Sequence, residues 1–263
     1  QSDADTIRDT AIAQPLIVSA SIASAKALLG SRSAHEAGVA GLAGHSVGEI
    51  AAASLAGVFD SETAIKFVQM RGNEMASAAA LELTSMAAVV GGDQDEVVAA
   101  LRALDLEPAN YNGGGQIVAA GSATAIEALK ANAPAGSRVI PLQVAGAFHT
   151  RYMKPAVASL ADYATSVTTA DPATKLWTNA GGHAIENGQE FLKLLVNQVS
   201  SPVRWDLCMA AMLEAGVTAL IEVSPAGTLV GLAKRSMPGI ESVALKTPEN
   251  LEAALQLMVN HAG

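Results

Sequence analysis

The chain has 263 residues, a formal net charge of −9 and one cysteine; half of its residues are hydrophobic and 16% are charged. This composition excludes a disordered chain, an intramolecular disulfide framework or cysteine metal cluster, and nucleic-acid binding through a global positive field. Polar residues interrupt every apolar stretch of about 18 residues, and the polar start is unlike a secretory signal, so we predict a cytoplasmic protein that does not span a membrane.

The first part of the chain has alternating helix and strand patterns. Helices are expected where an apolar-periodic run lies between a capping residue or proline and a glycine, and these runs are 15–29, 47–55 and 60–80. The short run 38–44 consists of small and apolar residues, as is typical of a buried strand. It leads directly into the second helix.

The middle of the chain changes character. Six short elements follow in the order β-α-β-β-α-β, at 86–90, 94–104, 107–111, 116–120, 124–131 and 138–144. The glycine-rich turn 112–115 joins the two central strands. This order is the split βαβ pattern of ferredoxin-like domains. We therefore predict a ferredoxin-like subdomain at 83–145, inserted into a larger α/β domain.

The last part of the chain again alternates between strands and helices. Strands are expected at 175–178, 217–223 and 242–245, and helices at 150–167, 191–199, 205–215, 227–236 and 248–260. This alternation predicts a parallel sheet that is covered by helices on both faces. Residues 1–82 and 146–263 are therefore assigned to one α/β, hydrolase-like core.

The motif Gly44-His45-Ser46-Val47-Gly48 matches G-x-S-x-G and lies between a predicted strand and a predicted helix, which is the context the motif requires. A sharp turn there exposes the serine hydroxyl, and the helix N-terminus offers unpaired N–H groups, that of Val47 first, to an oxyanion. The alternative is a glycine-rich turn with an incidental serine. The placement favours Ser46 as a nucleophile.

A serine nucleophile needs a base, and the best candidate among the five histidines is His149. It follows the last strand of the insertion and precedes a helix, where catalytic groups collect. Taken alone, a histidine at this place is more often structural. No acidic residue between Ser46 and His149 stands at the end of a core strand. A serine–histidine dyad, with a backbone carbonyl orienting the imidazole, is therefore favoured over a triad.

Arg71 lies in the otherwise apolar helical stretch 67–75 and has two interpretations. Its guanidinium can reach solvent or pair with Glu74, as is usual for an arginine on a helix. Alternatively, it can receive a substrate carboxylate in two parallel hydrogen bonds, which lysine cannot imitate. The residues alone favour the first interpretation.

Four motifs resemble the malonyl-CoA:acyl carrier protein transacylase family, most closely its actinobacterial branch. They are Gly44–Glu49, Met70-Arg71-Gly72, Ala147-Phe148-His149 and Gln198–Trp205, and the resemblance covers essentially the whole chain. It implies an [acyl-carrier-protein] S-malonyltransferase of fatty-acid or polyketide biosynthesis. Ser46 would take the malonyl group from CoA as an acyl-enzyme and pass it to the phosphopantetheine thiol of acyl carrier protein. The family fold is also a hydrolase-like domain with a ferredoxin-like subdomain.

The resemblance also implies roles for individual residues. His149 would be the base, oriented by a main-chain carbonyl near Gln198, and Arg71 would bind the malonyl carboxylate. Gln14 and Asn112 match polar positions that line the family's cleft, and the bulk of Phe148 favours malonyl over methylmalonyl groups. The basic residues that could meet an acidic carrier protein are Arg151, Lys154, Arg204, Lys234 and Arg235.

The expected partners are malonyl-CoA and acyl carrier protein, without nucleic acid or membrane, and the expected state is a monomer. No metal or organic cofactor is expected, since the CoA thioester is a substrate. The family starts with a strand and a Gly-Gln-Gly-Ser-Gln-type turn that supplies a second oxyanion donor. Nothing like it precedes Gln14, so we expect this N-terminal segment to be missing from the sequence. The alternatives are a serine thioesterase or esterase with the same elbow, and a non-catalytic fragment that binds carrier protein.

Overall fold

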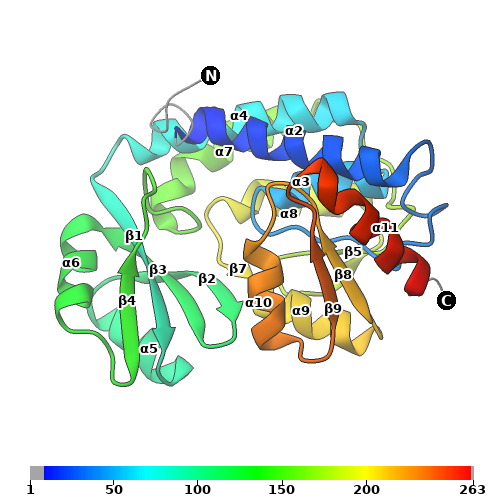
Figure 1. The fold of residues 1–263 in the computed structure, drawn as a ribbon. Helices are drawn as coiled ribbons and strands as arrows, with labels where there is room; N and C mark the ends of the chain where they lie inside the picture. Colours follow the sequence, from blue (N-terminus) through cyan, green and yellow to red (C-terminus); the bar gives the residue numbers. More distant parts are fainter. Residues whose placement is uncertain (1–8, 262–263) are drawn as a thin grey trace.

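The computed structural model describes residues 9–261, and its elements form two groups that lie side by side (Figure 1). One group contains β1 to β4 with α5 and α6, and the other contains the remaining helices and short strands. The chain leaves the second group after α4 (Ser61–Ala79), builds the first group from residues 84–141, and returns before α7 (Lys154–Ala164). This path is that of an insertion within a larger unit.

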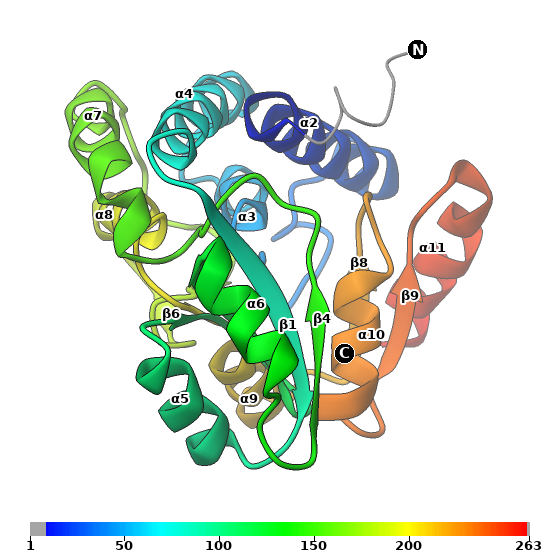
Figure 2. The same cartoon turned by 90° about the vertical axis from the view of Figure 1, so that its left-hand side faces the viewer.

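Three helices precede the insertion: α2 (Thr10–Leu29), α3 (Gly48–Ala56) and α4 (Ser61–Ala79). The first begins five residues before its predicted start, because Asp9 caps it by accepting a hydrogen bond from the Ala11 amide. Asp60 caps α4 in the same way, as the sequence predicted. In Figure 2, α2, α4 and α7 lie side by side above α3.

Of the described helices, α2 is the one that is long and apolar enough to cross a membrane, judged by length and composition alone. Its mean hydropathy is 1.5 over an 18-residue window of which 33% is buried. The polar residues that interrupt this helix are mostly Ser and Thr, which lower the mean hydropathy only a little. The prediction that the chain does not span a membrane stays a prediction. Its buried residues Val18 and Ile22 belong to the main hydrophobic core.

The inserted unit has the predicted element order. It comprises β1 (Thr84–Gly91), α5 (Gln94–Ala103), β2 (Glu107–Gly113), β3 (Gln116–Ser122), α6 (Ala123–Ala131) and β4 (Ser137–Pro141). Its strands pair antiparallel in the order β4-β1-β3-β2. Residues of β1 and β3 pack with buried residues of α5 and α6, among them Leu101 and Leu129. The predicted last strand ends early, at Pro141, so residues 142–149 form an irregular return to the core.

A short strand that was not predicted, β7 (Val203–Arg204), pairs in parallel with β2. It belongs to the second group, so the sheet becomes five-stranded and mixed, in the order β4-β1-β3-β2-β7. With only two residues, β7 is too short for a period-two pattern to reveal it. It joins the inserted unit directly to the core beside the candidate site.

The elements after the insertion are mostly helical. They are the 3-10 helix η1 (Arg151–Met153), α7 (Lys154–Ala164), β5 (Leu176–Trp177), β6 (Ala184–Ile185), α8 (Gly188–Gln198), α9 (Trp205–Glu214), β8 (Ala219–Glu222), α10 (Thr228–Ser236), β9 (Glu241–Ala244), the 3-10 helix η2 (Pro248–Asn250) and α11 (Leu251–Asn260). The helix predicted at 150–167 is therefore two pieces and ends three residues early.

The core strands do not pair into the continuous parallel sheet that was predicted. In the described part of the chain they form a parallel pair β8–β9, an antiparallel pair β5–β6, and one parallel bridge between Leu42 and Leu176. The predicted strand 38–44 contributes only that bridge. It is rich in glycine and alanine, which are poor strand formers, and Gly41 lies so close to Trp177 that a Cβ would collide with the indole ring.

The largest hydrophobic cluster lies between these helices of the core. Phe67 of α4, Ile50 of α3 and Phe191 of α8 are fully buried in it, together with Leu160 of α7. Ser46 lies two residues before α3, Arg71 lies on α4, and Gln198 ends α8. The packed helices therefore fix the positions from which three candidate site residues project.

Candidate active site

The turn between the Leu42 bridge and α3 presents Ser46 in a left-handed backbone conformation, with a φ of 52°. A Cβ on Gly44 would collide with the backbone of Gly48, whereas a Cβ on Gly48 would meet open space. Glycine is therefore required at the first position of the G-x-S-x-G motif but not, on steric grounds, at the last. The non-glycine residues with positive φ in residues 9–261 are Ser46, Asp105 and His149. Strained backbones of this kind cluster at functional sites.

Ser46 and His149, 103 positions apart, are in direct contact: Ser46 Oγ lies 2.7 Å from His149 Nε2. The other ring nitrogen, Nδ1, lies 2.8 Å from the main-chain oxygen of Gln198. A carbonyl oxygen can only accept, so Nδ1 bears the hydrogen and Nε2 is free to accept the serine proton. The His149 amide also donates to the Val199 carbonyl, at 3.0 Å. This is the dyad geometry that the sequence favoured.

The electrostatic surroundings of His149 keep the ring neutral. Burial lowers its pKa to about 3, and the nearby positive charge of Arg71 acts in the same direction. A neutral imidazole with a free Nε2 lone pair is the form that a general base requires.

The His149 imidazole is expected to stay neutral, with the proton on Nδ1, throughout the range from pH 7 down to pH 5. Nitrogen-15 chemical shifts of the labelled ring measure this directly. Between pH 6.5 and about 3 the unfolded chain binds a proton at this position and the folded chain does not, so His149 lowers the stability of the fold as the pH falls. A ring that becomes protonated near pH 6.5 would contradict this electrostatic description.

Arg71 lies on α4, is buried, and directs its guanidinium toward Ser46. Its Nη2 lies 3.3 Å from Ser46 Oγ and 2.8 Å from Gln198 Oε1, and its Nη1 donates to Gln14 Oε1. Burial lowers its pKa to about 10, which leaves the guanidinium charged at neutral pH. Neither solvent nor Glu74 is its partner, so the first interpretation of this residue is wrong. Within the described residues, its Nε has no hydrogen-bond partner.

Glu49, the residue after the motif, is a buried acid that the sequence analysis did not single out. Its carboxylate accepts hydrogen bonds from the Asn179 amide, at 2.7 Å, and from Gln198 Nε2. Burial raises the pKa of Glu49 to about 7, although the hydrogen bonds and the charge of Arg71 oppose this. An acid directly after G-x-S-x-G, in an otherwise apolar helix, was the available signal. Asn179, in a loop, gave none.

A pocket of about 210 Å³ lies over the nucleophile and is bounded by α2, α4 and the return segment 142–149. Three predicted residues, Gln14, Val47 and Phe148, line it together with Ser46, Arg71 and His149. No hydrogen bond to the Val47 amide is found within residues 9–261, so this N–H is available to a ligand. The site therefore combines a nucleophile, a base, a cation and a free backbone donor.

Asn112 is not among the residues that line this pocket. Its Oδ1 lies 2.9 Å from Nε2 of His45, so it joins the inserted unit to the residue beside the nucleophile. The His45 ring also packs edge-on against Trp205. Asn112 thus connects the inserted unit to the core beside the nucleophile, and its place in the substrate cleft stays a prediction.

The basic residues predicted to meet a carrier protein divide into two sets. Arg151 pairs with Asp105 and Glu107 of the inserted unit, at 2.6 and 2.7 Å. Arg204 pairs with Asp206 at 2.7 Å and lies over the Tyr111 ring. The other three of these five basic residues, Lys154, Lys234 and Arg235, form no ion pair within the described part of the chain.

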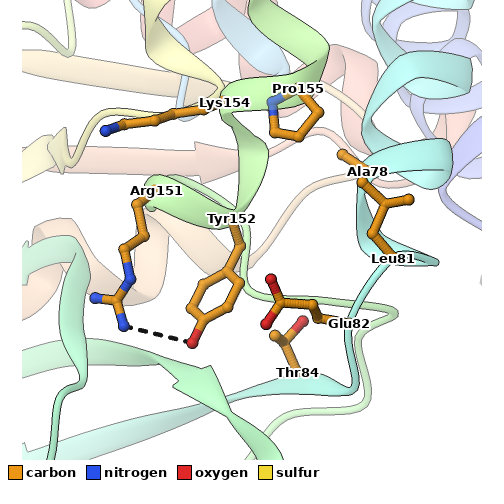
Figure 3. A pocket seen from close by; sticks show the side chains of 8 residues that line it. All are labelled: Ala78, Leu81, Glu82, Thr84, Arg151, Tyr152, Lys154 and Pro155. Atoms are coloured by element: carbon orange, nitrogen blue, oxygen red, sulfur yellow. Dashed lines mark hydrogen bonds between the residues drawn. The ribbon is translucent and has the colours of Figure 1, made fainter.

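A second pocket, of about 290 Å³, lies where the chain crosses between the two groups. Figure 3 shows Arg151 and Tyr152 extending side by side in it, with a hydrogen bond between them, while Lys154 extends separately. None of the dyad residues lines this pocket. In the described residues, no three His, Cys, Asp or Glu side chains gather to hold a metal ion.

Comparisons with known proteins agree with this chemistry. A family model described as "Acyl transferase domain" matches residues 1–247. A curated malonyl CoA-acyl carrier protein transacylase of Mycolicibacterium smegmatis is 47% identical over 258 residues, which are 97% of this chain and 88% of that protein. The Escherichia coli K12 protein of the same name is 35% identical over 222 residues, 82% of this chain and 72% of its own.

Solved structures give the same result. The crystal structure of MCAT from Mycobacterium tuberculosis superposes with a TM-score of 0.90 at 46% identity, covering 97% of this chain and 84% of that one. A type II PKS acyl-carrier protein in complex with its malonyl-transacylase matches with a TM-score of 0.88 at 29% identity, over 97% and 84% of the two chains. The overall architecture is thus an α/β fold with a mixed sheet.

Proposed function

Because the chain belongs to the acyl transferase family, in the branch of the malonyl-CoA:acyl carrier protein transacylases, we infer that it is an enzyme that transfers a malonyl group from CoA to the thiol of acyl carrier protein. The observation that carries this inference is the contact of Ser46 with both His149 and a buried Arg71 in one pocket. The acceptor serves fatty-acid or polyketide biosynthesis.

The reaction proceeds in two half-reactions at Ser46. In the first, His149 Nε2 takes the hydroxyl proton while the oxygen attacks the thioester carbonyl, and the Val47 N–H stabilises the oxyanion. CoA leaves as its thiol with the proton from His149, and the malonyl group stays on Ser46 as an ester. In the second, the phosphopantetheine thiol of acyl carrier protein attacks that ester, and His149 again moves the proton.

Arg71 would select substrates that bear a free carboxylate. Its two terminal nitrogens are held by the neutral side-chain oxygens of Gln14 and Gln198, so a malonyl carboxylate would replace neutral acceptors with a charged one. Phe148, on the wall of the same pocket, would limit the room for a methyl branch. The preference that this gives is modest, since one methyl group is worth about 1–3 kcal/mol in a pocket.

The variant Arg71→Ala is expected to lose about 10²–10³-fold in kcat/KM for malonyl-CoA, because two charge-assisted hydrogen bonds disappear. The loss for acetyl-CoA, which has no carboxylate, is expected to be several-fold at most. Steady-state kinetics with both thioesters measure this difference. Arg102→Ala, on the exposed face of α5, is the matched control. Equal losses for the two thioesters would remove Arg71 from the selection of substrate.

The function itself is tested by the intact mass of the protein after incubation with malonyl-CoA. We expect one malonyl group on Ser46 that disappears when holo acyl carrier protein is added, with malonyl carrier protein as the product. Release of malonate without the carrier would favour the alternative of a thioesterase or esterase. A protein that binds the carrier but never gains the malonyl mass would be the non-catalytic alternative.

We also propose that residues 1–82 and 146–263 form a hydrolase-like core and that 83–145 is a ferredoxin-like subdomain. The support is the β-α-β-β-α-β order of the inserted unit, with antiparallel strands ordered β4-β1-β3-β2. The protein would act in the cytoplasm as a monomer, with the CoA thioester as a substrate rather than a cofactor. Lys154, Lys234 and Arg235 would be the groups that meet an acidic carrier protein.

A further inference from the structure

The backbone of the nucleophile turn is held by side chains from two distant segments. Asn179, in the loop after β5, donates from Nδ2 to the Gly44 carbonyl at 2.8 Å and accepts at Oδ1 from the Ser46 amide at 2.8 Å. Gln198, at the end of α8, donates from Nε2 to the Ser46 carbonyl at 3.1 Å. The peptide groups on both sides of Ser46 are thus fixed from outside the turn.

Glu49 in turn holds the main chain of Asn179 and the side chain of Gln198. Its Oε1 accepts from the backbone N–H of Asn179 at 2.7 Å, and its Oε2 accepts from Gln198 Nε2. Asn179 and Glu49 are each 1% exposed, so no water competes for these bonds. A carboxylate can accept a hydrogen bond at each of its two oxygens. A glutamine at this position has one oxygen and one NH2 group, so its NH2 group would face an N–H donor and one of the two hydrogen bonds would be lost.

We propose that Asn179 is a positioning residue for acyl transfer, which holds the Ser46 turn so that the hydroxyl stays in line with His149 Nε2, and that Glu49 fixes Asn179 and Gln198 for this purpose. The proposal rests on the transfer through Ser46 inferred above. Ser46 has a φ of 52°, a conformation that persists only where its surroundings impose it. Without these hydrogen bonds the turn relaxes, and a displacement of about 1 Å lowers a rate about 10²-fold.

Asn179 acts through Ser46 and not on the substrate. It does not line the pocket over the nucleophile. Because the Ser46 amide is bonded to Asn179, the amide that remains for an oxyanion on this turn is that of Val47. Loss of the Asn179 side chain should therefore lower kcat. The KM for malonyl-CoA should stay nearly unchanged, because Arg71, and not Asn179, binds the malonyl carboxylate.

The test compares Asn179→Ala with Asn187→Ala. Asn187 is an exposed cap of α8 whose loss also removes side-chain hydrogen bonds, but far along the helix from the turn. We expect Asn179→Ala to lower kcat by about 10–10²-fold at nearly constant KM, and Asn187→Ala to leave both unchanged. An alkyl fluorophosphonate, which phosphonylates the serine hydroxyl with loss of fluoride, should label Ser46 of the first variant slower by a similar factor.

A second variant, Glu49→Gln, tests the same arrangement with almost no change in shape, and we expect a fall in kcat and in labelling rate of about tenfold. Wild-type rates of labelling in folded Asn179→Ala, or in Glu49→Gln should the alanine variant fail to fold, would overturn the proposal. The labelling rate does not depend on malonyl-CoA. A wild-type protein that is labelled but never malonylated would refute the proposed function alone.

Discussion

Replacement of Ser46 by alanine is expected to abolish the malonyl acyl-enzyme and to lower the rate of transfer by about 10⁴-fold or more. Within residues 9–261, the Ser46 hydroxyl is the nucleophilic group that contacts both His149 and Arg71. Cys208, the lone thiol, is no substitute, because burial raises its pKa to about 12 and keeps it protonated. Intact mass after malonyl-CoA and a coupled assay of carrier-protein acylation measure the two effects.

The serine and histidine should act as a unit. We expect His149→Ala to be nearly as inactive as Ser46→Ala, and the double variant to be no worse than the more damaging single one. Ser54→Ala, in the C-terminal half of the same helix α3, is the matched control and should retain full activity. A stable malonyl adduct on the Ser46→Ala protein would show that another nucleophile does the chemistry.

Gly44→Ala is expected to have the largest effect on the fold of any single methyl addition in the site. The new Cβ would overlap the backbone of Gly48 and Glu49, and backbone cannot move aside as a flexible side chain can. We expect a loss of about 4 kcal/mol or more in the free energy of unfolding, which is the range of exceptional substitutions. Urea unfolding followed by circular dichroism measures it.

The same methyl group at Gly48 provides the control. Its Cβ would meet nothing within 4 Å, and Gly48 is the first residue of α3, where alanine has the higher helix propensity. Gly48→Ala should therefore unfold at the same or a higher urea concentration than the wild type. Equal destabilisation by both substitutions would mean that the close approach at Gly44 is not what requires glycine there.

Elements with their own local signals were predicted well from the sequence. The inserted unit has a cap or a glycine turn at almost every boundary, and its six elements are found in the predicted order. The strands of the core were predicted less well, because their pairing depends on contacts between segments that are distant in the sequence. The run 38–44 makes a single bridge, and the two-residue strands β6 and β7 have no periodicity to detect.

The residues of the site differed in how readily the sequence identified them. The motif alone indicated Ser46, whereas His149 needed elimination among five histidines and Arg71 needed the family resemblance. Asn112 was assigned to the cleft from the resemblance, and its contact with His45 is one that the sequence did not indicate. Glu49 and Asn179 were missed, since their importance comes from hydrogen bonds over about 130 residues of sequence separation, such as that from the Asn179 amide to Glu49.

The two chain crossings between the core and the inserted unit touch each other, and this makes the unit a replaceable block. Thr84 at its entry accepts a hydrogen bond from the Ala147 amide just beyond its exit, at 2.9 Å. A homologous block could therefore be transplanted without altering the distance that the core must bridge, provided that the junction falls before Gly146. The donor would also have to supply an acceptor for His45 and carboxylates for Arg151. Exchange of this block between relatives would leave in place Ser46, His149 and Arg71, and also the basic residues Lys154, Lys234 and Arg235, because all of them belong to the core.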